Sequence, residues 1–170
     1  MITPDQVMPL LLKACPSFTD TWLSIEEENK DDSVPAGRLL YLDAGDFVRH
    51  LAGLKGAGTT DEFNAVFDVI ERLVVEGDDY VSNLGVIGFI EGFQMHTVTS
   101  FGLDPEIHFR PHLRPISHAW WIRVNRFWAG EHDALQATDE QIAFEASKVN
   151  HRQPRLARWL RRRLRALPSR

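Results

Sequence analysis

Glu91 is the residue of this sequence whose position most suggests chemistry. It is the only formally charged side chain in residues 80–103, within a predicted helix that is apolar on nearly all sides. A carboxylate in such surroundings needs a partner, or its pKa rises. A structural role would pair it with a Trp N–H, a backbone group or an arginine. The candidate arginines are Arg72, Arg123 and Arg126.

Two other roles for Glu91 remain open: general acid–base catalysis and binding at the foot of a groove. Catalysis would use Glu91 with Glu71 or His96, and Asp68 could extend the acidic cluster. A solvated helix face with one internal ion pair explains the same carboxylates more simply. We therefore assign no catalytic residue and expect a protein that is not an enzyme.

Three histidines, His108, His112 and His118, are close enough in sequence to suggest a metal site. Pro111 disfavours the helix that would align the first two, and no cysteine or well-placed carboxylate accompanies them. Cys15, the single cysteine, follows an apolar run and indicates a core residue. Phosphate-binding, dinucleotide-binding and hydrolase motifs are missing from the sequence. We expect neither a metal nor a cofactor.

The elements that position these residues are predicted to be helices. Capping signals and helical apolar spacing favour 4–14, 18–29, a helix capped by Asp43, one capped by Thr59 or Thr60, 79–96, 117–128, 139–149 and a basic helix from Pro154. Prolines break up residues 101–116. The expected fold is all-α, a single compact domain of six to eight helices in antiparallel or orthogonal packing. The glycine-rich helix 79–96 is expected to be buried at its centre.

Charge divides the chain into two parts. Residues 1–150 hold all 24 acidic residues and 11 of the 19 basic ones, a formal charge of −13, whereas residues 151–170 hold eight arginines and no acidic residue, a charge of +8. We expect an acidic helical domain at 1–150, whose charge opposes binding to nucleic acid and suits a basic protein. The candidate partner-binding residues are Glu26, Glu27, Glu28, Asp31, Asp32, Asp78 and Asp79.

Residues 151–170 are predicted to form a basic amphipathic helix. Its apolar stripe consists of Leu156, Trp159, Leu160, Leu164 and Leu167, and its basic face of Arg155, Arg158, Arg161, Arg162 and Arg165. Arg163 lies within the apolar stripe and must reach solvent or meet a carboxylate. We expect the helix to pack on the acidic domain. Contact with an anionic membrane, nucleic acid or an acidic protein is the alternative.

Several segments resemble a known family. They are Cys15–Phe18, Asp46–Leu51, and a core that reads Phe67-x-x-Ile70-Glu71-Arg72-Leu73, Glu76-Gly77-Asp78 and Gly88-Phe89-x-Glu91-Gly92-x-Gln94. This pattern is similar to that of small bacterial proteins known only as a domain of unknown function. The resemblance covers roughly residues 5 to 130. It implies a helical protein without an established activity, in a family that includes candidate immunity proteins found beside toxin systems.

These observations favour a protein that binds another protein. The most concrete form is an immunity protein that neutralises an antibacterial toxin, such as a nuclease, by covering its basic surface. The alternative is a nucleic-acid- or membrane-associated module that acts through the arginine-rich C-terminal helix. A single cysteine and the lack of a signal-peptide pattern or a membrane-spanning run predict a cytoplasmic location.

Overall fold

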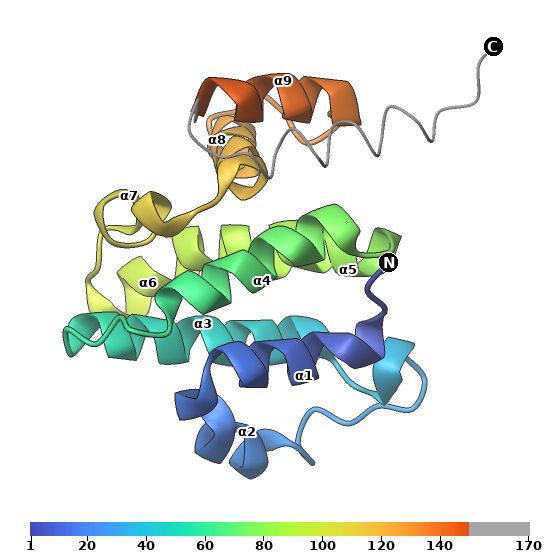
Figure 1. The fold of residues 1–170 in the computed structure, drawn as a ribbon, viewed down its shortest axis with the longest axis vertical. Coiled ribbons are helices and arrows are strands. Elements are labelled where there is room, and N and C mark those ends of the chain that lie inside the picture. The colour runs from blue at the N-terminus through green and yellow to red at the C-terminus, as the bar shows by residue number, and fades with distance from the viewer. Residues whose placement is uncertain (150–170) are drawn as a thin grey trace.

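The described part of the chain folds into stacked layers of helices. The computed structural model describes residues 1–149, apart from the side chains of residues 96–99. From top to bottom, α9 lies on α8, α8 lies on the layer of α4 to α6, and α3 and α1 lie beneath that layer, with α2 at the base (Figure 1). The helices are α1 (Pro4–Ala14), α2 (Thr19–Ile25), α3 (Leu40–Gly56), α4 (Phe63–Glu76), α5 (Asp79–Asn83), α6 (Gly92–Phe101), α7 (Pro105–His108), α8 (Pro115–Trp128) and α9 (Asp139–Val149).

Short helices of other types link them. Three are single 3₁₀ turns: η1 (Pro16–Phe18), η2 (Pro35–Gly37) and η4 (Arg110–His112); the fourth, η3 (Leu84–Glu91), is a π-helix. Because α5, η3 and α6 are continuous, the described residues contain eight α-helical segments. Their only extended pairings are two isolated bridges. The predicted all-α fold is confirmed.

Local sequence signals predicted several helix ends correctly. The backbone N–H of Thr3 donates to the Gln6 side chain at 3.1 Å. Thr138 and Gln141 form a reciprocal capping box, with distances of 3.0 and 3.3 Å. Asp78 caps α5 by accepting from the N–H of Val81 at 2.8 Å. Such caps need only residues three positions apart, so the sequence alone reveals them.

Other boundaries were predicted incorrectly. The second helix ends at Ile25 instead of about residue 29, and α4 begins at Phe63, three residues after Thr60. Asp43 does not cap α3, which begins at Leu40, because its side chain is fully buried in an ion pair. The ion pair with Arg38, which precedes the helix, therefore outweighed the capping preference of Asp43.

The glycine-rich helix is central, as predicted, but longer than expected and partly of another type. The continuous run extends from Asp79 to Phe101, and its middle, η3, contacts α3, α4 and α8. A Cβ on Gly85 would approach Val74 of α4 to 2.7 Å, and one on Gly88 would approach Ala44 of α3 to 3.1 Å. Glycine therefore lets two different helices pack closely against η3.

Residues 1–149 contain no helix with both the length and the apolar character needed to cross a membrane. The predicted basic helix lies outside the described residues. Its packing on the acidic domain, and the division of the chain at residue 150, stay predictions.

Candidate protein-binding surface

The loop between α2 and α3 carries five of the seven predicted acidic binding residues, and a buried ion pair anchors it. Arg38 donates to Asp43 through Nε at 2.8 Å and through a terminal nitrogen at 3.0 Å. The side-chain amide of Asn29 donates to the same carboxylate at 2.8 Å. The Asp43 side chain is fully buried, so each of its hydrogen bonds matters for stability.

Arg38 also fixes the start of the loop. Its guanidinium lies 4.2 Å from the centre of the Trp22 ring and donates to the carbonyl of Glu26 at 2.9 Å. The two ends of the loop are paired by a backbone bond from Leu39 N–H to Asn29 at 2.8 Å. The acidic residues are therefore held on an ordered loop close to α3.

The start of α5 lies at the same end of the molecule as the start of α3 (Figure 1). Tyr41 of α3 and Tyr80 of α5 meet edge to face, with ring centres 5.8 Å apart. Gly77 makes the preceding turn possible, because a Cβ there would lie 2.4 Å from the Leu73 carbonyl oxygen. Asp78 and Asp79 are thereby placed beside the aromatic pair.

We call these residues the acidic end, and define it as the seven predicted carboxylates together with the exposed apolar side chains of α2, of the α2–α3 loop and of the start of α3. Glu27, Glu28, Asp32 and Asp79 are exposed, and Glu26, Asp31 and Asp78 are half-buried. The apolar members are Leu23, Leu39, Tyr41 and Leu42, of which Leu23 and Leu42 are more than half exposed. Apolar side chains surrounded by charged groups are typical of a protein interface.

Two of these carboxylates are occupied in shaping the backbone. Asp31 accepts from the hydroxyl and the N–H of Ser33, and these bonds lower the pKa of Asp31. Asp78 caps α5. Glu27 pairs with the exposed Lys30. Glu28, Asp32 and Asp79 remain the members best placed to meet a basic partner.

The sequence reasoning missed the residues that build this surface. Arg38 and Asp43 form the anchor, and Tyr41 and Leu42 supply exposed apolar area. The only sequence signal for the anchor is the position of Arg38, five residues before Asp43 and just ahead of α3.

Glu91 lies at the end of η3 and is half-buried. Burial raises the pKa of Glu91, and a hydrogen bond from the Trp128 side chain opposes the rise. Of the partners that the sequence left open for Glu91, a Trp side chain is the one present, and the three candidate arginines pair with other carboxylates. Arg72 pairs with Glu76, Arg123 with Glu145 and Arg126 with Glu131.

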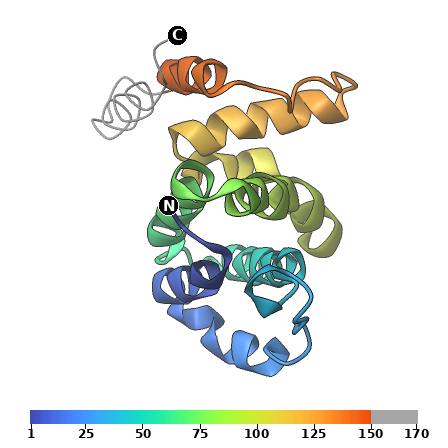
Figure 2. The same ribbon diagram turned by 90° about the vertical axis from the view of Figure 1, so that its right-hand side faces the viewer.

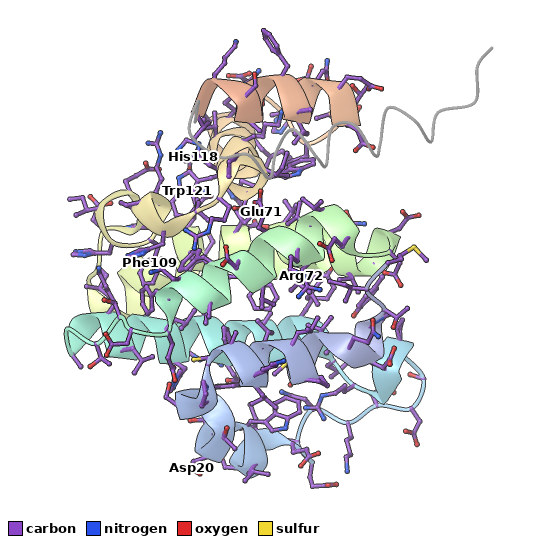
Figure 3. All side chains as sticks on the ribbon, viewed as in Figure 1. Asp20, Glu71, Arg72, Phe109, His118 and Trp121 are labelled. Atoms are coloured by element: carbon purple, nitrogen blue, oxygen red, sulfur yellow. The ribbon has the colours of Figure 1, made fainter. Side chains whose placement is uncertain are left out.

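Glu71, which a catalytic site would have used together with Glu91, makes structural contacts. It accepts from the N–H groups of Ile116 at 2.9 Å and Ser117 at 2.7 Å, so it caps the first turn of α8. Figure 3 shows Glu71 between α4 and α8. Asp68 likewise holds Arg114 at 2.8 Å. Glu71 thus joins α4 to the first turn of α8, and Asp68 joins α4 to the residue just before it. His96 lies among the side chains that are not described.

A polar cluster joins Cys15, Ser17, His50 and Glu62. The Cys15 thiol donates to Glu62 at 3.0 Å, and the Ser17 hydroxyl contacts Glu62 and, at 2.9 Å, His50 Nε2. The cluster brings together the Cys15–Phe18 and Asp46–Leu51 segments of the family resemblance.

The protonation and hydrogen bonds of this cluster suit a structural clamp between helices and not a catalytic site. Burial, aided by Glu62, raises the pKa of the Cys15 thiol to about 12, which leaves the sulfur protonated and a poor nucleophile. Burial also lowers the pKa of His50. Glu62 bonds Ser17 directly instead of orienting the histidine, unlike the order in a catalytic triad. The bonds tie the end of α1 to the start of α4.

The three candidate histidines do not form a metal site. His118 accepts from Arg110 at 3.1 Å, and His112 stacks on the ring of Phe67. No group of three or more His, Cys, Asp or Glu side chains in the described part of the chain could hold a metal ion. The predicted basic face, from Arg155 to Arg165, lies outside the described residues.

Residues 8–129 match the model of a family described as Domain of unknown function (DUF7674). The chain belongs to this family. The matched residues include the acidic end, the Cys15 cluster and the whole α5–η3–α6 run. The expected membership of a domain family of unknown function is confirmed. No curated protein and no solved structure matches the chain.

Proposed function

We propose that this chain is a non-enzymatic protein-binding protein of the immunity type, which neutralises an antibacterial toxin by covering a basic surface with its acidic end. The observation that carries the proposal is the anchored α2–α3 loop. It carries the exposed carboxylates Glu28 and Asp32 and leads directly into α3, whose first turn exposes Tyr41 and Leu42. Apolar side chains would supply affinity, and the carboxylates would supply steering and specificity.

A nuclease toxin suits this surface best. Such an enzyme binds phosphates through Lys and Arg side chains, and a row of carboxylates presents the same sign of charge as its substrate. The buried Arg38–Asp43 pair would keep the loop ordered before binding, which reduces the entropy lost on association. Inhibition of this kind would take place in the cytoplasm of a bacterial cell.

Co-expression tests the proposal. The gene beside the one for this protein is expressed as a toxin, alone or with the wild-type chain, the double variant Glu28→Lys/Asp32→Lys, or the matched control Asp61→Lys/Asp133→Lys. Both control aspartates are exposed, Asp61 just before α4 and Asp133 between α8 and α9, and they undergo the same change in charge. We expect growth with the wild type and the control, and toxicity with the Glu28/Asp32 variant. Failure of the wild type to relieve toxicity would contradict immunity, and rescue by all three proteins would place the interface elsewhere.

A further inference from the structure

The end of α8 carries a large apolar side chain that is exposed. Trp128 lies four and seven residues after the buried Val124 and Trp121, so all three occupy one stripe of α8. Trp128 is nevertheless 55% exposed. Its neighbour Glu91 and the 38% exposed Ile87 both belong to η3. We call Ile87, Glu91 and Trp128 the α8–η3 face.

The geometry of η3 places two members of this face together. Because a π-helix bonds residue i to i+5, side chains four apart lie on nearly the same side. Ile87 and Glu91 therefore share one side of η3, away from Gly85, which packs on α4. Figure 2 shows α8 between α9 and the α5–η3–α6 run.

In the described part of the chain, no cation pairs with Glu91 of the α8–η3 face. Within residues 1–149, every ion pair of Arg72, Arg123 and Arg126 is made with another carboxylate, and none involves Glu91. A half-buried carboxylate close to Trp and Ile side chains suits a cationic side chain that is itself flanked by apolar residues. Lysine or arginine on a hydrophobic helix face meets this description.

The sequence of residues 151–170 contains such a cationic side chain among apolar residues. In helical spacing, Arg163 falls inside the apolar stripe of Leu156, Trp159, Leu160, Leu164 and Leu167. An arginine there is costly to cover unless a carboxylate faces it. Glu91 has no ion-pair partner among residues 1–149, and Arg163 is an arginine that helical spacing would place within an apolar stripe.

The chain is long enough to bring the two together. The described residues end at Val149 of α9, which is joined to α8 by the Arg123–Glu145 pair at 2.8 Å. Residues 150–154 can span up to about 17 Å, and a helix over 155–163 is about 14 Å long, whereas α8 itself is about 21 Å long. Arg163 can thus reach the far end of α8.

We propose that residues 151–170 cover the α8–η3 face as an amphipathic helix, with Arg163 paired to Glu91 and the leucine stripe packed on Ile87 and Trp128. The charge of this segment is then held apart from the acidic end. The proposal concerns a contact within the chain and does not depend on the proposed function.

Charge reversal in the full-length chain tests the pairing. The variants are Glu91→Arg, Arg163→Glu and the double swap, compared by the rate of trypsin cleavage within residues 150–170. We expect each single variant to be cleaved at least about tenfold faster than the wild type, and the double swap to recover most of the protection, because cleavage reports the population of the open state. Equal cleavage rates in all four proteins would overturn the proposal.

A cross-link covers the case in which Glu91→Arg fails to fold. Ile87→Cys with Leu167→Cys should form an intramolecular disulfide under mild oxidation, and the control Asp61→Cys with Leu167→Cys should not. If neither pair cross-links, and the segment binds anionic vesicles or RNA equally in the wild type and in Glu91→Gln, the segment is a free binding arm and the proposal is wrong.

Discussion

Replacing Asp43 by alanine is expected to destabilise the protein strongly, because Asp43 is the centre of the loop anchor. Its side chain is fully buried and accepts two hydrogen bonds from Arg38 and one from Asn29. Removing one partner of a buried ion pair costs about 3–5 kcal/mol. The stacking of Arg38 on Trp22 and its bond to the Glu26 carbonyl remain, so we expect the lower part of that range, about 3 kcal/mol.

Urea unfolding, followed by circular dichroism, measures this loss. The matched control is Glu27→Ala, which removes one partner of the exposed Lys30–Glu27 pair and should cost about 1 kcal/mol or less. A second control, Arg38→Met/Asp43→Leu, removes both buried charges and should be clearly more stable than Asp43→Ala.

Hydrogen exchange locates the effect. In Asp43→Ala, the amides of Asp31 and Leu39, which bond across the loop, should exchange faster than in the wild type. An Asp43→Ala protein within about 1 kcal/mol of the wild type, with unchanged exchange in the loop, would refute the anchor.

Three further changes test other parts of the fold. Burial raises the pKa of Glu71 above its ordinary value of 4.5, so the folded state holds this proton more tightly than the unfolded state does. The tighter binding of this proton therefore stabilises the folded state fully below pH 4.5, and the stabilisation declines as the pH rises through the folded-state pKa of Glu71. Unfolding measured at several pH values should show this decline in the wild type and not in Glu71→Gln. Gly85→Ala should cost about 1–3 kcal/mol, since its Cβ would lie 2.7 Å from Val74, whereas Gly56→Ala, with no atom within 4 Å, should be neutral or slightly stabilising in the same unfolding assay. Cys15, fully buried with its pKa raised to about 12, should resist a maleimide at pH 8 and react in urea; rapid labelling of the folded protein would contradict the clamp.

Local patterns in the sequence predicted much of the fold. The Thr138–Gln141 box and the Asp78 cap depend on residues within one turn, and the structure contains both. The glycine-rich helix was correctly expected at the centre, because a helix apolar on all sides has to be buried. Its π-helical middle was not foreseen, since the sequence pattern of a π-helix is also compatible with an α-helix.

The features that the sequence did not reveal depend on contacts between residues far apart in the chain. Cys15 and Glu62 are 47 residues apart, and Glu71 caps a helix that begins more than 40 residues later. Asp43 looked like a helix cap because its partner Arg38 precedes the helix. For the acidic end, the sequence led us to propose the carboxylates as binding residues. It did not indicate that Tyr41 and Leu42 are exposed, since both fit an ordinary helix face.

The most direct test of the proposed function is a calorimetric titration of the product of the adjacent gene, as the candidate toxin, with the purified protein at low and high salt. We predict binding that weakens as salt rises, a loss of affinity of at least about tenfold in Glu28→Lys/Asp32→Lys, and a change of less than about threefold in Asp61→Lys/Asp133→Lys. Equal affinity for both variants, or no binding by the wild type, would contradict recognition through the acidic end.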